Sequence, residues 1–238
     1  MTMEKMKVEV WSDVMCPFCY IGKRKFEQAL DRLPFKDQVD LEWKSYQLNP
    51  HLQTDTTLDY YDSLAQSKGM ARTQAEAMCL QVTEMAKGEQ LTFRLDKAIV
   101  ANSFRAHELA HFAKRYGKQD QAEELLFQAH FTEGENIDDM DLLKRIAAQL
   151  GLDGTALEHA LENRVFEDEV RQDIYEAQQL GVRGVPFFVY DRKYAISGAQ
   201  DITVFRDTLQ KAFDGWTQKN GSRLDVVNGD SCGPDGCA

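Results

Sequence analysis

Two groups of strand-like segments lie near the ends of this 238-residue chain, and helix-like segments fill the space between them. "KVEVW" at 7–11 and "VDLEWKSYQL" at 39–48 alternate polar and apolar residues, which is typical of strands. "VPFFVY" at 185–190 and "KYAISG" at 193–198 form the second group. This order predicts one α/β domain that is split by a helical insertion, rather than two domains in tandem.

From about residue 58 to residue 180 the pattern is that of successive helices, with apolar residues three and four apart and several closing glycines. The segments are "TQAEAMCLQVTEMA", "KAIVANSFRAHELAHFAKRYG", "QAEELLFQAHF", "MDLLKRIAAQLG" and "ALEHALENRVFEDEVRQDIYEAQQLG". A last helix, "DITVFRDTLQKAF", ends at about residue 213. The expected division is an α/β domain of residues 1–55 and 178–215, an all-helical insertion of residues 56–177, and an extended tail of residues 216–238.

The chain is acidic, with 28 basic and 39 acidic residues and a formal net charge of −11. This balance argues against nucleic acid or an anionic membrane as the main partner and favours small molecules or proteins. The N-terminus carries no apolar leader segment, and no apolar run approaches the length of a membrane helix, so we expect a cytoplasmic protein. In a reducing compartment, closely spaced cysteines indicate transient redox chemistry or metal binding.

Two of the five cysteines lie in "SDVMCPFCYIGK", between an expected strand and an expected helix. Cys16 would stand at the helix N-terminus, where free amides and the positive end of the dipole stabilise a thiolate. Pro17 suits the first helical position, and Cys19 comes one turn later, within reach of a disulfide. This asymmetry predicts that Cys16 attacks and that the more buried Cys19 resolves the mixed disulfide.

A second feature, "GVRGVPFFVY", places Pro186 at the start of an apolar strand. Proline forfeits a hydrogen bond of the sheet, so it belongs at a strand end, where a cis bond after Val185 is plausible.

Through "SDVMCPFCYIGK" and "GVRGVPFFV" the chain resembles the DsbA-like thioredoxin-fold oxidoreductases, and most closely their FrnE-like branch. The segments "NSFRAHELAHFA" and "FQAHFTEGENIDDMDLLKRIAAQLGLD" resemble the middle of that branch. The resemblance implies a thioredoxin-like fold with an inserted all-helical domain, a redox pair of Cys16 and Cys19, and a cis-proline, Pro186, facing it. It also implies that Asn102 and His107 border the cleft. Phe18 stands where better-known DsbA members commonly have histidine.

The sequence therefore predicts a cytoplasmic thiol-disulfide oxidoreductase, acting as oxidase, reductase or isomerase on protein or peptide disulfides. Phe18 and the backbone at Val185 are the expected substrate contacts. No cofactor is expected, although glutathione or a thioredoxin system could exchange electrons with the pair. The alternative is a glutathione-dependent transferase or isomerase of kappa-like architecture, because "CPFC" resembles the glutaredoxin motif.

"HELAH" at 107–111 spells the HExxH motif of zinc peptidases, in which two histidines bind the metal and the glutamate acts as base. The third-histidine extension of one such class is missing, and Leu109 and Phe112 indicate a packed helix. Glu133 and Glu135 are only distant candidates for a third ligand. A zinc metallopeptidase therefore stays the less favoured alternative, and we expect no metal site here and place His107 and His111 on a helix that lines an interface or cleft.

The remaining cysteines are Cys79 and the pair in "SCGPDGCA". Cys79 shares an expected buried helix face with Ala75, Met78, Val82 and Met85, which indicates an inert core thiol. Cys232 and Cys237 flank a turn sequence that would bring their thiols together. We expect a second redox pair there, while inert thiols or a zinc site shared with the first pair remain open.

Overall fold

The computed structural model describes residues 4–220, 232–233 and 236–237, and it joins strands from both ends of the chain in one sheet. The strands are β1 (Met6–Ser12), β2 (Val39–Ser45), β3 (Phe187–Tyr190) and β4 (Tyr194–Ser197), in the order β2-β1-β3-β4. β1 is parallel to β2 and antiparallel to β3, and β3 is antiparallel to β4. The predicted α/β class with a helical insertion is confirmed.

Helices α1 (Pro17–Asp31) and α9 (Ile202–Asn220) pack against each other beside the sheet. Their shared core is aromatic, since the Phe26 ring stacks on Phe188 at 5.5 Å and the Phe205 ring meets Phe188 edge-on at 4.8 Å between centroids. Aromatic side chains bury more apolar surface than other side chains, so these rings contribute most of the stabilisation of this core.

Helix α9 continues to Asn220, so the predicted end at about residue 213 and the predicted start of the tail at residue 216 are both wrong. The reason is packing. The Phe213 ring stacks on Phe35 with 3.8 Å between centroids, and the indole of Trp216 is buried in the same core. Burying these two rings favours continuation of the helix.

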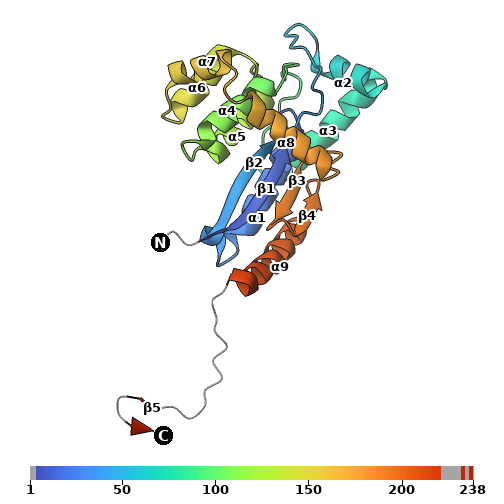
Figure 1. Cartoon of the computed structure of the whole chain (residues 1–238). Coiled ribbons are helices and arrows are strands. Elements are labelled where there is room, and N and C mark those ends of the chain that lie inside the picture. The colour runs from blue at the N-terminus through green and yellow to red at the C-terminus, as the bar shows by residue number, and fades with distance from the viewer. Residues whose placement is uncertain (1–3, 221–231, 234–235, 238) are drawn as a thin grey trace.

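Seven α-helices of the described chain lie between β2 and β3, and Figure 1 shows them gathered toward one end of the sheet. They are α2 (Tyr60–Lys68), α3 (Arg72–Gly88), α4 (Phe104–Lys114), α5 (Gln119–Gln128), α6 (Met140–Gln149), α7 (Gly154–Glu162) and α8 (Glu167–Gln179). A π-helical turn (Ala129–Glu133) follows α5, and a 3-10 turn (Lys36–Gln38) precedes β2. The domain boundaries at 55/56 and 177/178 stay predictions. None of the described helices is long and apolar enough to span a bilayer.

One expected helical run, from residue 156 to residue 181, is divided into α7 and α8. Arg164 adopts a left-handed conformation at φ 53°, which ends α7. The turn brings the buried Phe166 edge-on against Phe112 of α4, 6.0 Å between ring centroids. A buried contact thus divides a run whose local pattern is helical throughout.

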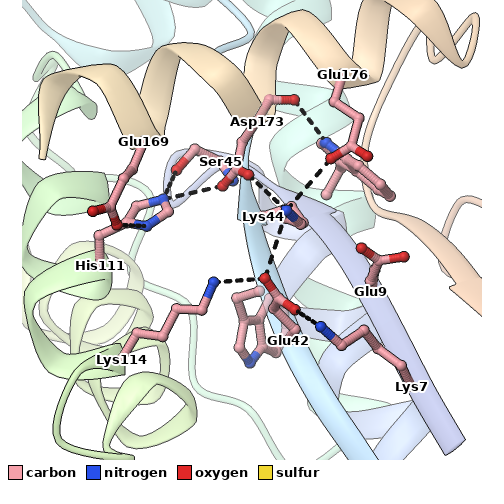
Figure 2. A network of polar contacts seen from close by, with 12 residues as sticks. Lys7, Glu9, Glu42, Lys44, Ser45, His111, Lys114, Glu169, Asp173 and Glu176 are labelled. Carbon is pink, nitrogen blue, oxygen red and sulfur yellow. Dashed lines mark hydrogen bonds and ion pairs between the residues drawn. The ribbon is translucent and has the colours of Figure 1, made fainter.

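A polar network ties the sheet to α4 and α8, as Figure 2 shows. The carboxylate of Asp173 accepts from Lys44 Nζ at 2.9 Å and from the Ser45 amide at 3.0 Å, and it lies 3.0 Å from His111 Nε2. Burial alone would raise the pKa of Asp173, but His111, Lys44 and the Ser45 amide hold it below its usual value. The network continues through Lys44, which lies 3.5 Å from Glu42 of β2, and Glu42 pairs with Lys114 of α4 at 2.5 Å.

Near the C-terminus the structure describes two short antiparallel strands, β5 (Cys232–Gly233) and β6 (Gly236–Cys237). Their register places Cys232 opposite Cys237. The side chains of this predicted pair lie outside the described part of the chain.

Candidate active site

Cys16 is the residue that precedes the first turn of α1, and Pro17 occupies that turn. The Cys16 amide donates to the Asp13 carbonyl at 2.9 Å, and the Cys19 amide donates to the Cys16 carbonyl at 2.9 Å. The first turn of α1 carries no acidic residue. The positive end of the helix dipole is therefore available to a thiolate at Cys16, as the sequence predicts.

The two thiols of the motif are free, and burial distinguishes them. Cys16 is 4% exposed, whereas Cys19 is fully buried. Burial raises the pKa of the Cys19 thiol well above its usual range, and the neighbouring Cys16 raises it further. A buried thiol that holds its proton suits the second step of an exchange, while the more accessible Cys16 suits the first.

The Val185–Pro186 segment lies against this dithiol, although 169 positions separate it from Cys16 in the chain. The Cys16 thiol donates to the Val185 carbonyl at 3.4 Å, and the Val185–Pro186 peptide bond is cis. The site therefore combines one element from each end of the sequence.

Gly22 of α1 allows Pro186 to come this close. A Cβ at position 22 would stand 3.0 Å from Pro186 Cγ and 3.6 Å from the Phe188 ring. Helix α1 thus positions the dithiol at its N-terminus, and about one turn further along, at Gly22, it packs against the segment that contains Pro186.

Phe18 projects beside the dithiol with 39% of its surface exposed. Val185 is half-buried. An exposed aromatic ring next to a half-buried backbone segment suits contact with a polypeptide, and this role stays a prediction.

Asp13 is a buried residue of the site that the sequence analysis missed. Its carboxylate accepts from the Leu48 amide at 2.7 Å and from the Met15 amide at 3.2 Å, and it lies 3.7 Å from His107 Nε2. Burial alone would raise the pKa of Asp13, but His107, the Leu48 amide and the Ser103 side chain lower it. Asp13 in turn raises the pKa of His107 against the effect of burial. In the sequence, only its position three residues before Cys16 could have indicated that Asp13 belongs to the site.

Two more titratable side chains are buried in the helices that cover this region. Burial raises the pKa of Glu123 in α5 to about 7, partly offset by His107. Burial lowers the pKa of His130, in the π-helical turn, to about 4. Both groups are therefore easily neutralised, as expected where water is excluded.

Asn102 makes hydrogen bonds to two backbone groups and to the Gln47 side chain. Its Oδ1 accepts from the Phe104 amide at 2.9 Å and from Gln47 Nε2 at 3.0 Å, and its Nδ2 donates to the Leu52 carbonyl at 2.7 Å. Asn102 thus holds the segment after β2 against the start of α4.

The two histidines of "HELAH" have different partners. His107 faces Asp13, whereas His111 lies at the interface with β2 and α8, 3.1 Å from Ser45 Oγ. Among residues 4–220, no group of three or more His, Cys, Asp or Glu side chains is arranged so that it could hold a metal ion. The histidines therefore contribute to packing between the helices and the sheet.

Cys79 is buried, as expected, and burial raises its pKa to about 11. The predicted face is wrong for two of its members, because Met78 and Met85 are 42% and 45% exposed. Helix α3 packs instead along Ala75, Cys79 and Ala86, whose small side chains permit a close approach.

Comparison with known proteins gives matches over almost the whole chain. A family model described as "DSBA-like thioredoxin domain" matches residues 7–210. The crystal structure of a probable DsbA oxidoreductase, SCO1869 from Streptomyces coelicolor, is 34% identical, with a TM-score of 0.82 and 98% of each chain covered. The uncharacterised protein YwbO of Bacillus subtilis (strain 168) is 32% identical over 205 residues, which are 85% of this chain and 94% of YwbO.

A more distant match shows the fold alone. The structure of the cytosolic disulfide reductase DsbM from Pseudomonas aeruginosa with GSH is 15% identical, with a TM-score of 0.59 and coverage of 90% of this chain and 98% of DsbM. Together with the nearer matches, it confirms the predicted thioredoxin-like fold.

Proposed function

The chain belongs to the family of DSBA-like thioredoxin domains and is a DsbA-like thiol-disulfide oxidoreductase, and from this premise we propose that its substrates are disulfides of proteins and peptides. One observation carries the proposal. Cys16 stands at the start of α1 with its sulfur 3.4 Å from the Val185 carbonyl, so the reactive thiol and the backbone segment before β3 converge on one point.

The exchange proceeds in two steps. The Cys16 thiolate attacks one sulfur of a substrate disulfide, forms a mixed disulfide and releases the other sulfur as a thiolate. Cys19 then gives up its proton, attacks Cys16 Sγ and forms the Cys16–Cys19 disulfide, which releases the second substrate thiolate. The substrate gains two electrons and the pair loses two, and the reverse sequence oxidises a dithiol.

The backbone around Val185 and Pro186 would hold the extended substrate beside Cys16. Main-chain hydrogen bonds to a strand end accept many sequences, because they do not depend on side chains. Phe18 would add an apolar contact to the same substrate. This combination suits a protein that meets many different polypeptides.

The test is reduction of insulin disulfides by wild type, Cys16→Ser, Cys19→Ser and the matched control Cys79→Ser. We expect loss of turnover in both motif variants, a trapped mixed disulfide in Cys19→Ser, and unchanged rates in Cys79→Ser. Full activity of Cys16→Ser would exclude the assignment. If activity requires glutathione and survives Cys19→Ser, the alternative of a glutathione-dependent enzyme is correct instead.

The finer assignment has three parts. We place the chain in the FrnE-like branch, in the cytoplasm, and with Cys232 and Cys237 as a second redox pair that exchanges with the first. The motifs around Cys16 and Pro186 support the branch, and the register of β5 and β6 supports the second pair. The reduction potential of Cys16 and Cys19 would distinguish reductase, isomerase and oxidase roles.

A further inference from the structure

A cleft of about 650 Å³ lies between the segment after β2 and the helices α4, α7 and α8. Its walls include Thr54, Glu108 and Arg164, but neither Cys16 nor Cys19. Clefts of this volume are typical of sites for small molecules. The redox chemistry described above does not use it.

Glu108 of α4 is the distinctive group in this cleft. Its side chain is buried, with 3% of the residue exposed, and its Oε1 has no hydrogen-bond partner among the residues that the structure describes. The other well-covered acids of the wall have partners, since Asp138 accepts from Thr54 Oγ1 at 2.6 Å and Glu167 pairs with Arg171 at 2.6 Å. A buried carboxylate without a donor is costly, so Glu108 points to a ligand that supplies one.

Guanidinium groups stand near this acid. Arg105 and Arg164 line the same cleft, and both are close enough to favour the ionised form of Glu108. Both are exposed, and each has a long contact to an acid of the wall, 3.8 Å from Arg105 to Asp138 and 3.5 Å from Arg164 to Glu167. Exposed pairs of this kind are weak, so both guanidinium groups can turn toward an incoming anion. The cleft thus holds one buried carboxyl group, which can bind a cation, beside two exposed guanidinium groups, which can bind an anion.

We propose that this cleft binds a small zwitterion with a free α-amino group, an amino acid or a short peptide. Its ammonium pairs with the Glu108 carboxylate, and its carboxylate meets Arg105 and Arg164. Arginine suits the second contact, because its planar fork matches a carboxylate. Glu108 is the acid of "HELAH", which neither the dithiol nor a metal explains.

Protonation gives the site a signature. Burial, with a smaller contribution from Glu167, raises the pKa of Glu108 to about 7, while Arg105 and Arg164 lower it. An ammonium favours the carboxylate, so binding near neutral pH releases a proton and the affinity rises with pH through this range. The other charged groups of the cleft wall are Asp138, Glu162, Glu167 and Arg171.

The experiment is titration calorimetry of the full chain with L-alanyl-L-alanine, its N-acetyl derivative and its C-terminal amide. The titration is repeated in two buffers of different ionisation enthalpy, and the difference between the two binding enthalpies gives the number of protons released. We expect the free dipeptide to bind with proton release, and the N-acetyl form to bind about tenfold to a hundredfold more weakly, the usual effect of losing a charged hydrogen bond. The amide should bind more weakly than the dipeptide. Arg164→Ala should reduce that difference, and replacing both Arg105 and Arg164 by alanine should remove it.

Glu108→Gln keeps the shape of the side chain. It should weaken binding of the dipeptide about tenfold or more and abolish proton release. Glu162→Gln, an exposed acid of the same wall, is the matched control and should change neither. Insulin reduction by both variants reports that they are folded. Failure of all three probes to bind wild type, equal binding of the N-acetyl form, or equal effects of the two glutamine variants would overturn the proposal, and none of these results bears on the dithiol.

Discussion

At the scale of single residues, Asp13 organises the loop before Cys16. Its carboxylate holds the amides of Met15 and Leu48 and faces His107, so one side chain joins the active-site loop, the segment after β2 and helix α4. Carboxylates that accept several amide hydrogens favour their ionised form. His107, whose pKa Asp13 raises, supplies the matching positive charge when it is protonated.

The pair of Asp13 and His107 predicts a stability that depends on pH. The pKa of His107 is raised, so its contribution is complete below the ordinary histidine value of about 6.5 and is lost as pH rises through the folded value. The pKa of Asp13 is lowered, so its contribution is present above about 3.9 and is lost as pH falls.

His107→Gln should therefore reduce the free energy of unfolding in urea by about 1–3 kcal/mol near pH 6, and by less near pH 9. The exposed His51 provides the control, and His51→Gln should change stability little at either pH. A loss that is equal at both pH values would show that His107 acts through shape alone.

At the scale of elements, the contact between α1 and the start of β3 predicts a second result. Gly22→Ala would force a Cβ to 3.0 Å from Pro186 Cγ, whereas nothing lies within 4 Å of a Cβ at Gly88 in α3. Alanine favours both helices, by about 1 kcal/mol. Gly22→Ala should thus be less stable than Gly88→Ala by about 1–3 kcal/mol in urea unfolding, and slower in insulin reduction because Pro186 shifts. Equal stabilities of the two variants would show that the segment around Pro186 moves away from the new Cβ without loss of stability.

The elements also show what local sequence can and cannot predict. Alternation and strand-breaking residues identify β1 to β4, and the helical block follows from apolar spacing. The break at Arg164 and the extension of α9 through Trp216 depend on Phe112 and Phe35, which are distant in sequence. Spacing likewise could not show that Met78 faces solvent, because periodicity describes a face and not what covers it.

The same limit applies to the site. The helix-opening motif identifies Cys16 and Cys19, and the proline at a strand start identifies the segment that meets them. Asp13 was not identified, and Glu108 was considered only as the base of a metal motif, because the importance of both comes from burial against segments far along the chain. Nothing in "SDVM" or "HELAH" alone records those neighbours.

At the scale of the whole molecule, the network around Asp173 joins the helical block to the sheet (Figure 2). Asp173→Ala would leave Lys44 and the Ser45 amide without their shared acceptor in a mostly buried place. Lys44 keeps its ion pairs with Glu42 and Glu176, so the loss should be that of an unsatisfied buried donor, about 1–3 kcal/mol in urea unfolding. Asp31→Ala, which removes the exposed pair with Lys36, should stay within about 0.5 kcal/mol. Similar losses in the two variants would contradict a structural role for the network.

The last prediction concerns the C-terminal pair. Directly opposed residues of antiparallel strands have Cα atoms about 4.5–5.5 Å apart, within the range of a disulfide, so the register of Cys232 and Cys237 permits one. Removing residues 229–238 should leave single-turnover chemistry at Cys16 nearly unchanged and alter multiple-turnover rates. Replacing both cysteines by serine at full length should reproduce this effect, and unchanged rates in both variants would mean that the pair is not part of the cycle.

The distance along the chain between Cys16 and Val185 sets an order of events during translation. The dithiol leaves the ribosome first, and 169 positions must follow before the carbonyl that meets it has been made. At about 5–20 residues per second, this interval is on the order of ten to thirty seconds. Throughout that time the nascent chain carries the two thiols but lacks the Val185–Pro186 segment, which would align a substrate disulfide beside them. A ribosome-bound chain that stops before residue 185 thus has both sulfur atoms of the active site but lacks the surface that orients a disulfide toward Cys16.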